Sequence, residues 1–157
     1  KVKKILEIGL GTNNENLISN MGKYGTPGAS VRAFRDFFKN ANIFGADIDK
    51  KILFKENRIK TFYVDQTRID SLEKLYKKTK NNFDLIIDDG LHAPYTNLNF
   101  IITGINKIKK GGWLIIEDIP FKTKPIWEII SFIINTKQKS FLIKTKNCYI
   151  FLVNRKS

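Results

Sequence analysis

The sequence opens with Ile5-Leu6-Glu7-Ile8-Gly9-Leu10-Gly11, a short apolar run that closes on two glycines. A run of this length fits a buried strand, and the glycines allow the chain to turn tightly where the strand ends. Backbone N–H groups beside such a turn can approach a ligand closely. The segment therefore predicts the first strand of an α/β sheet, with a binding site at its carboxyl end.

The rest of the chain alternates strand-length apolar runs with segments of helical periodicity, a pattern typical of a parallel sheet. The predicted strands are 5–8, 42–46, 59–64, 83–87 and 113–116, and the predicted helices are 29–39, 69–78, 95–109 and 125–135. Two more runs, 140–143 and 149–153, flank a tight turn and predict an antiparallel hairpin at one sheet edge. We therefore predict an α/β fold: a mostly parallel seven-stranded sheet with a C-terminal antiparallel hairpin, in a single domain over residues 1–157.

The composition is that of a globular protein, with 42% hydrophobic and 12% aromatic residues. No apolar run approaches the roughly 20 residues that span a bilayer, and the opening residues do not form the apolar segment of a signal peptide. We therefore expect no association with a membrane. The single cysteine, Cys148, cannot form an internal disulfide, which fits a reducing cytoplasm, and its apolar neighbours predict a buried strand position.

The net charge of +13 raises the alternative of a nucleic-acid-binding protein. The lysines are scattered, however, and they accompany an excess of Ile and Asn, as in proteins of low-GC genomes whose surfaces have drifted. No basic stripe interleaved with aromatic residues, of the kind that binds single strands, is visible. The charge therefore leaves nucleic-acid binding open but does not favour it.

The predicted strands end in acidic residues or glycine. These strand ends are Gly9, Asp47, Asp65, Asp88-Asp89 and Glu117-Asp118. In open α/β sheets, ligands bind in the crevice outside the carboxyl ends of the strands. Because carboxylates gathered at one edge repel one another, their presence there indicates a functional site.

The segment after the first strand favours a methyl donor over a nicotinamide cofactor. A dinucleotide site requires a third glycine where Asn14 stands, and a helix N-terminus for its pyrophosphate. Here the polar, aperiodic segment 12–28 delays the helix, and S-adenosylmethionine carries no phosphate. Asp47 could then accept the ribose hydroxyls, Asp65 and Gln66 would border the adenine, and Asp88 would face the amino group of the methionine moiety. A nicotinamide-dependent oxidoreductase remains an alternative.

These residues resemble the pattern of class I S-adenosylmethionine-dependent methyltransferases, with an acidic-x-Gly-x-Gly motif at Glu7 to Gly11. Asp88-Asp89-Gly90-Leu91-His92, followed by Gly111-Gly112-Trp113-Leu114-Ile115-Ile116-Glu117-Asp118, further resembles the macrocin-type sugar O-methyltransferases and the related cephalosporin hydroxylase-like family. Those proteins usually carry Ser at the position of Leu91, and their larger N-terminal region has no counterpart in this sequence. The resemblance implies a Rossmann-like fold, S-adenosylmethionine as cofactor and a divalent cation that holds substrate hydroxyls. The cofactor-binding residues would be Glu7, Gly9, Gly11, Asp47, Asp65, Gln66 and Asp88.

His92 is the only histidine, and it follows an acidic strand end beside the predicted cofactor site. Because imidazole exchanges protons near neutral pH, we predict His92 as the general base for methyl transfer to a hydroxyl of a sugar or small natural product. Asp89, Glu117 and Asp118 form an oxygen-rich set suited to Mg²⁺, although Glu117 and Asp118 could instead cap the following loop. Segment 12–28 is either a lid or a surface loop. An RNA-modifying enzyme is the remaining alternative, but the chain lacks an Asn-Pro-Pro-Tyr-like motif after the fourth strand.

Overall fold

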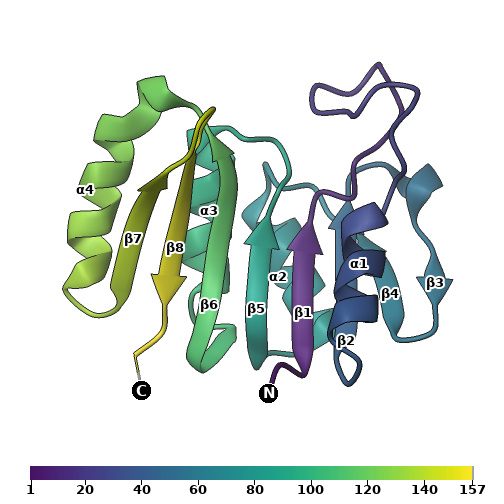
Figure 1. Cartoon of the computed structure of the whole chain (residues 1–157), viewed down its shortest axis with the longest axis horizontal. Coiled ribbons are helices and arrows are strands. Elements are labelled where there is room, and N and C mark those ends of the chain that lie inside the picture. Colours follow the sequence, from purple (N-terminus) through teal and green to yellow (C-terminus); the bar gives the residue numbers. More distant parts are fainter. Residues whose placement is uncertain (157) are drawn as a thin grey trace.

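The computed structural model describes residues 1–156, which build one eight-stranded sheet (Figure 1). The strand order is β3-β4-β2-β1-β5-β6-β8-β7. The parallel strands are β1 (Lys4–Ile8), β2 (Asn42–Asp47), β4 (Ile59–Tyr63), β5 (Phe83–Asp88) and β6 (Ile108–Ile119). The antiparallel strands are β3 (Lys55–Glu56), β7 (Lys139–Lys144) and β8 (Tyr149–Asn154). The α/β class, the mostly parallel sheet and the C-terminal hairpin are confirmed.

Helices cover both faces of the sheet, and the apolar faces of the strands form two separate cores. Helix α1 (Ala29–Phe37) lies in front of the sheet in Figure 1, where Val31 packs in the smaller core with Ile5 and Ile43. Helices α2 (Ile69–Thr79) and α3 (Pro94–Gly104) lie behind it. They share the larger core with α4 (Lys124–Asn135), whose Trp127 is fully buried.

The structure differs from the predicted elements at two points, and both result from pairing between strands. A two-residue strand, β3, adds an eighth strand because Glu56 pairs antiparallel with Ile59. Strand β6 begins at Ile108, which pairs with Phe83, whereas residues 107–109 were predicted to be helical. The register of this pair shifts before Trp113, where Gly111 has a φ of 75°. Gly111 and Gly112 thus lie at an irregularity within strand β6 and do not end a helix.

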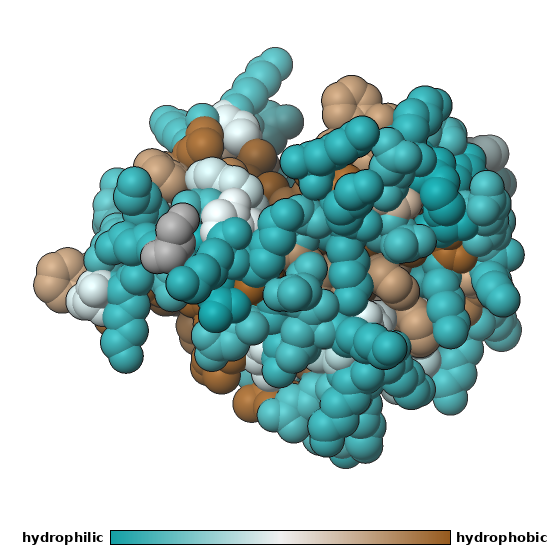
Figure 2. All heavy atoms as spheres, turned by 90° about the horizontal axis from the view of Figure 1, so that it is seen from below, coloured by the Kyte–Doolittle hydropathy of each residue, from teal (hydrophilic) through white to brown (hydrophobic). Residues whose placement is uncertain are grey.

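The carboxyl ends of the parallel strands point to one edge of the molecule, and β1 is the strand at which the order reverses. It pairs with β2 on one side and β5 on the other, with connections running to opposite faces. This switch point is where ligands bind in sheets of this kind. The opposite edge is mainly hydrophilic (Figure 2) and carries exposed lysines such as Lys3 and Lys80, which precede β1 and β5.

Within residues 1–156, no helix has the length and apolar character needed to cross a bilayer.

Candidate active site

A cavity of about 770 Å³ opens at the carboxyl ends of β1, β2, β4 and β5. Its lining includes Gly9 and Gly11, the strand ends Asp47, Asp65 and Gln66, and the turn 89–92 with Asp118 beyond it. The cavity volume is in the range of small-molecule sites. The structure thus brings together most of the residues that the sequence placed at this edge.

The two glycines have the left-handed backbone that the tight turn needs, with φ values of 96° for Gly9 and 73° for Gly11. A Cβ atom on Gly9 would collide with the carbonyl oxygen of Asp89. The glycine therefore lets the end of β1 lie directly against the turn that follows β5.

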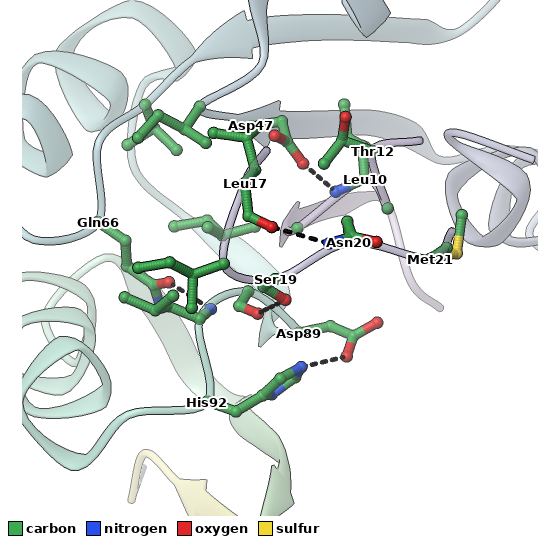
Figure 3. A pocket seen from close by; sticks show the side chains of 18 of the residues that line it. Leu10, Thr12, Leu17, Ser19, Asn20, Met21, Asp47, Gln66, Asp89 and His92 are labelled. Atoms are coloured by element: carbon green, nitrogen blue, oxygen red, sulfur yellow. Dashed lines mark hydrogen bonds and ion pairs between the residues drawn. The ribbon is translucent and has the colours of Figure 1, made fainter. Parts of the chain in front are cut away.

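Asp47 holds this glycine turn and also faces the cavity (Figure 3). Its Oδ2 accepts a hydrogen bond from the backbone N–H of Leu10 at 2.7 Å, and its Oδ1 accepts one from Asp49 N at 2.9 Å. Asp65 and Gln66 line the cavity from the end of β4. Asp65 accepts hydrogen bonds from the backbone and hydroxyl of Thr67 at 3.0 and 2.6 Å.

Glu7 and Asp88 lie beneath the cavity and not in its wall. Glu7 is 2% exposed and accepts a hydrogen bond from Ser30 Oγ at 2.5 Å. Burial raises the pKa of Glu7 to about 8; the Ser30 bond opposes this, and the charges of Asp89 and Glu117 add to it. Asp88 is fully buried and bonded within the protein, so its position does not support the predicted contact with a ligand's amino group.

Asp89, His92 and Asp118 form the chemical end of the site. One possible ligand atom from each lies within 4.8 Å of the others. His92 Nε2 is 3.8 Å from Asp89 Oδ1, and the two side chains point toward one another (Figure 3). Both His92 and Asp118 have positive φ, at 53° and 50°. Such a backbone is uncommon outside glycine, and it aims these side chains into the cluster.

The carboxylates of this cluster repel one another. Burial raises the pKa of Asp89; the nearby negative charge of Asp118 adds to this shift, whereas His92 opposes it. Burial also raises the pKa of Glu117, and Asp89 and Asp118 raise it further. Glu117 was predicted to lie with Asp89 and Asp118. It lies outside the cavity wall and outside the three-residue cluster, whose third member is His92.

The sequence did not single out individual residues of segment 12–28, yet residues 16–21 form one wall of the cavity. Ser19 Oγ donates a hydrogen bond to the carbonyl oxygen of Gly90 at 2.8 Å, joining this segment to the turn 89–92. Tyr95, at the start of α3, also lines the cavity and was not predicted. The length of segment 12–28 could have indicated this wall. A long connection between the first strand and the first helix must occupy space near the strand ends.

Comparison with known proteins shows sequence similarity to O-methyltransferases. No family model matches the sequence. Mycinamicin VI 2''-O-methyltransferase of Micromonospora griseorubida is 30% identical over 116 residues, which cover 74% of this chain and 27% of that protein. Demethylmacrocin O-methyltransferase of Streptomyces fradiae is 31% identical over 116 residues, with the same coverage of 74% and 27%. The chain thus spans about a quarter of the length of the curated relatives it matches.

Solved structures share the fold. The MycE methyltransferase from the mycinamycin biosynthetic pathway, in complex with Mg and SAH, superposes with a TM-score of 0.77 at 22% identity. That superposition covers 99% of this chain and 46% of the other. Human methyltransferase-like protein 13 in complex with SAH gives a TM-score of 0.65 at 13% identity, over 100% of this chain and 73% of that one. The chain therefore has the class I S-adenosylmethionine-dependent methyltransferase fold, and its resemblance to the macrocin-type sugar O-methyltransferases is confirmed by sequence similarity over 74% of its length.

Proposed function

We propose that the chain is the catalytic domain of an S-adenosylmethionine-dependent O-methyltransferase, which acts with Mg²⁺ on a hydroxyl of a sugar or small natural product. The observation that carries the proposal is the composition of the cavity. Its one end is a glycine turn with a buried Asp47, and its other end is the Asp89, His92 and Asp118 cluster. Relatives that the chain matches are named as O-methyltransferases of glycosylated natural products.

The residues present fit the cofactor. Gly9 and Gly11 line the cavity without a side chain, and the side chain of Leu10 packs in the smaller core. Asp47 and Asp65 offer carboxylate oxygens to ribose hydroxyls and the adenine end, and Ile48, 46% exposed, offers an apolar surface beside them. Gln66 lies in the same wall.

The residues also fit a divalent cation. Asp89 and Asp118, with Glu117 close by, are oxygen donors whose mutual repulsion a cation would relieve. Mg²⁺ prefers oxygen ligands, so it would be held by the carboxylates and not by the His92 imidazole. The solved structure of the MycE methyltransferase is a complex with Mg and SAH.

The chemistry follows from this arrangement. When bound, S-adenosylmethionine supplies an electrophilic methyl group and Mg²⁺ acidifies and orients the acceptor hydroxyl. Nε2 of His92 would accept the proton of that hydroxyl, while transfer of the methyl group to its oxygen would break the S–CH3 bond of the sulfonium and release S-adenosylhomocysteine. Asp89, 3.8 Å from Nε2, stabilises the resulting imidazolium.

The electrostatics of the cavity favour an uncharged acceptor over RNA. Four aspartates are among the lining residues, and in the described chain no Lys or Arg belongs to that lining. Phosphates approaching this mouth would meet negative charge, whereas nucleic-acid binding depends on cations that neutralise phosphates. Because the lone cysteine fits a reducing compartment, we place this activity in the cytoplasm.

Isothermal titration with S-adenosylmethionine and with NADH, each with and without Mg²⁺, tests the proposal. We expect micromolar binding of the methyl donor alone, and weaker binding by the Asp47→Asn variant. A panel of glycosides, incubated with labelled methyl donor, then identifies the acceptor. Binding of NADH in place of S-adenosylmethionine would overturn the proposal. Methyl transfer that continues undiminished in EDTA would overturn the proposed role of Mg²⁺.

A further inference from the structure

A buried polar network lies directly beneath the turn 89–92, and the proposed chemistry does not use it. Its members are Asp88, Gln66 and Asn97, which are 0%, 7% and 2% exposed. They come from three elements: the end of β5, the segment after β4 and the first turns of α3. Buried polar groups are costly unless bonded, so a fully bonded network at this depth specifies one arrangement of the chain around it.

Asp88 is the centre of the network. Its Oδ1 accepts hydrogen bonds from Gln66 Nε2 at 2.5 Å and from the backbone N–H of Gly90 at 3.3 Å. Its Oδ2 accepts one from Asn97 Nδ2 at 2.9 Å. Both carboxylate oxygens are thus occupied by groups of the protein.

Gln66 connects this centre to the turn. Its amide nitrogen donates to Asp88, while its Oε1 accepts a hydrogen bond from Leu91 N at 3.1 Å. A Cβ atom on Gly90 would collide with the same Oε1, so the carboxamide lies against the backbone of the turn. Gln66 therefore contacts the two residues that separate Asp89 from His92.

The turn needs such support because His92 has a φ of 53°. A non-glycine residue keeps this conformation only where its surroundings hold it. Ser19 also bonds to Gly90, but it belongs to segment 12–28, whereas Gln66 is anchored to the sheet through Asp88.

We propose that Gln66 is a positioning residue, whose carboxamide holds the turn 89–92 so that His92 and Asp89 face each other. This inference rests on the proposed function, since it concerns the same cluster. It differs from a role of Gln66 as an adenine ligand, because both ends of the carboxamide are engaged within the protein. A displacement of about 1 Å at a reacting group costs on the order of a hundredfold in rate.

The Gln66→Met variant tests the proposal, because it keeps the length of the side chain and removes both hydrogen bonds. Gln138→Met is the matched control: it makes the same change of side chain, but Gln138 follows α4, lies outside the cavity lining, and its Oε1 accepts a hydrogen bond from Lys156 N. Since His92 is the only histidine, ¹⁵N-histidine labelling gives one imidazole spin system that reports on the turn without assignment. Titration with S-adenosylmethionine, Mn²⁺ binding and the separation of kcat from KM complete the measurements.

For Gln66→Met we expect shifted imidazole resonances, Mn²⁺ binding at least about threefold weaker, and kcat at least about tenfold lower. The affinity for S-adenosylmethionine should change by less than about threefold, and Gln138→Met should match the wild type in the imidazole and kcat readouts. If Gln66→Met does not fold, Gln66→Asn, which retracts the amide by one methylene, should produce the same pattern.

An imidazole signal identical to that of the wild type would overturn the inference, and so would loss of cofactor affinity with kcat unchanged. Failure of the proposed function looks different, because the wild type itself would then bind no S-adenosylmethionine. The imidazole and Mn²⁺ measurements would still report whether Gln66 holds the turn.

Discussion

Replacing Glu7 with Gln should stabilise the protein at high pH and not at low pH. Glu7 is 2% exposed, and burial raises its pKa from 4.5 to about 8. Between these two values the folded protein keeps a proton that the unfolded chain has released. Unfolding then releases a proton, so the free energy of unfolding falls as the pH rises from about 4.5 to about 8. Glutamine cannot ionise, and its carbonyl can still accept the hydrogen bond from Ser30.

The size of the effect follows from the difference between about 8 and 4.5, which is about 3.5 pH units. At about 1.4 kcal/mol per unit, the upper limit is about 5 kcal/mol. Water admitted by local opening reduces this cost, so we expect a gain of about 2 to 5 kcal/mol at pH 8.5 and little change near pH 5. For a chain of this size, the gain corresponds to a melting temperature higher by at least about 4 °C.

Urea unfolding followed by tryptophan fluorescence at pH 5, 7 and 8.5 measures this difference, in EDTA and without cofactor so that ligand binding does not contribute. The matched control is Glu73→Gln, because Glu73 lies exposed on α2. A Glu7→Gln variant whose stability relative to wild type is the same at all three pH values would refute the reasoning.

Four further predictions concern the site and the core. His92→Ala should lower turnover on the order of a hundredfold or more while the affinity for S-adenosylmethionine stays within about threefold; unchanged turnover in a labelled-methyl assay would contradict its role as base. Asp118→Asn should abolish the rise in melting temperature that Mg²⁺ gives the wild type, and an equal rise in both proteins would place the ion elsewhere. Ser19→Ala removes the bond to Gly90 O, worth about 1 kcal/mol, so stopped-flow dissociation of the cofactor should be about fivefold faster; an unchanged rate would mean that segment 12–28 does not retain the ligand. Trp127→Ala should cost about 3 to 5 kcal/mol in urea unfolding, since this fully buried ring packs with its centroid 5.0 Å from that of Phe151, and a loss below about 1 kcal/mol would contradict its place in the core.

The sequence predicted the elements whose own residues specify them. Strands β1, β2, β4 and β5 lie within a residue or two of their predicted bounds. Strands β1 and β5 are buried on both faces, which favours a nearly continuous apolar run, whereas β4 exposes Lys60 and Tyr63. The start of β6 was missed because Lys109 to Gly112 carry the signature of a helix end. Their strand conformation depends instead on the distant Arg155, which bonds with both Gly111 and Gly112.

The site was predicted at the level of strand ends, and the individual side chains less well. Asp88 is the last residue of β5 and is fully buried, whereas Asp89 lies beyond the strand, in the turn that lines the cavity. Of the two acidic pairs, Asp89 and Asp118 line the cavity. Asp88 is buried, and Glu117 lies outside the lining. Which member of each pair faces the cavity depends on the register shift of β6 between Ile116 and Ile119, and on partners such as Gln66, which is 22 residues from Asp88 in the sequence.

Non-glycine residues with a positive φ occur in two settings in this chain, in structural turns and at the candidate site. Non-glycine residues with positive φ are Arg58, Lys80, Asn82, His92 and Asp118. The first three lie in tight connections that lead into β4 and β5, at the edge opposite the cavity. His92 and Asp118 instead belong to the cluster that also gathers repelling carboxylates. Backbone strain and charge repulsion, each unfavourable for folding, thus coincide at one end of one cavity, and such coincidence is expected where a chain retains a geometry for binding and chemistry.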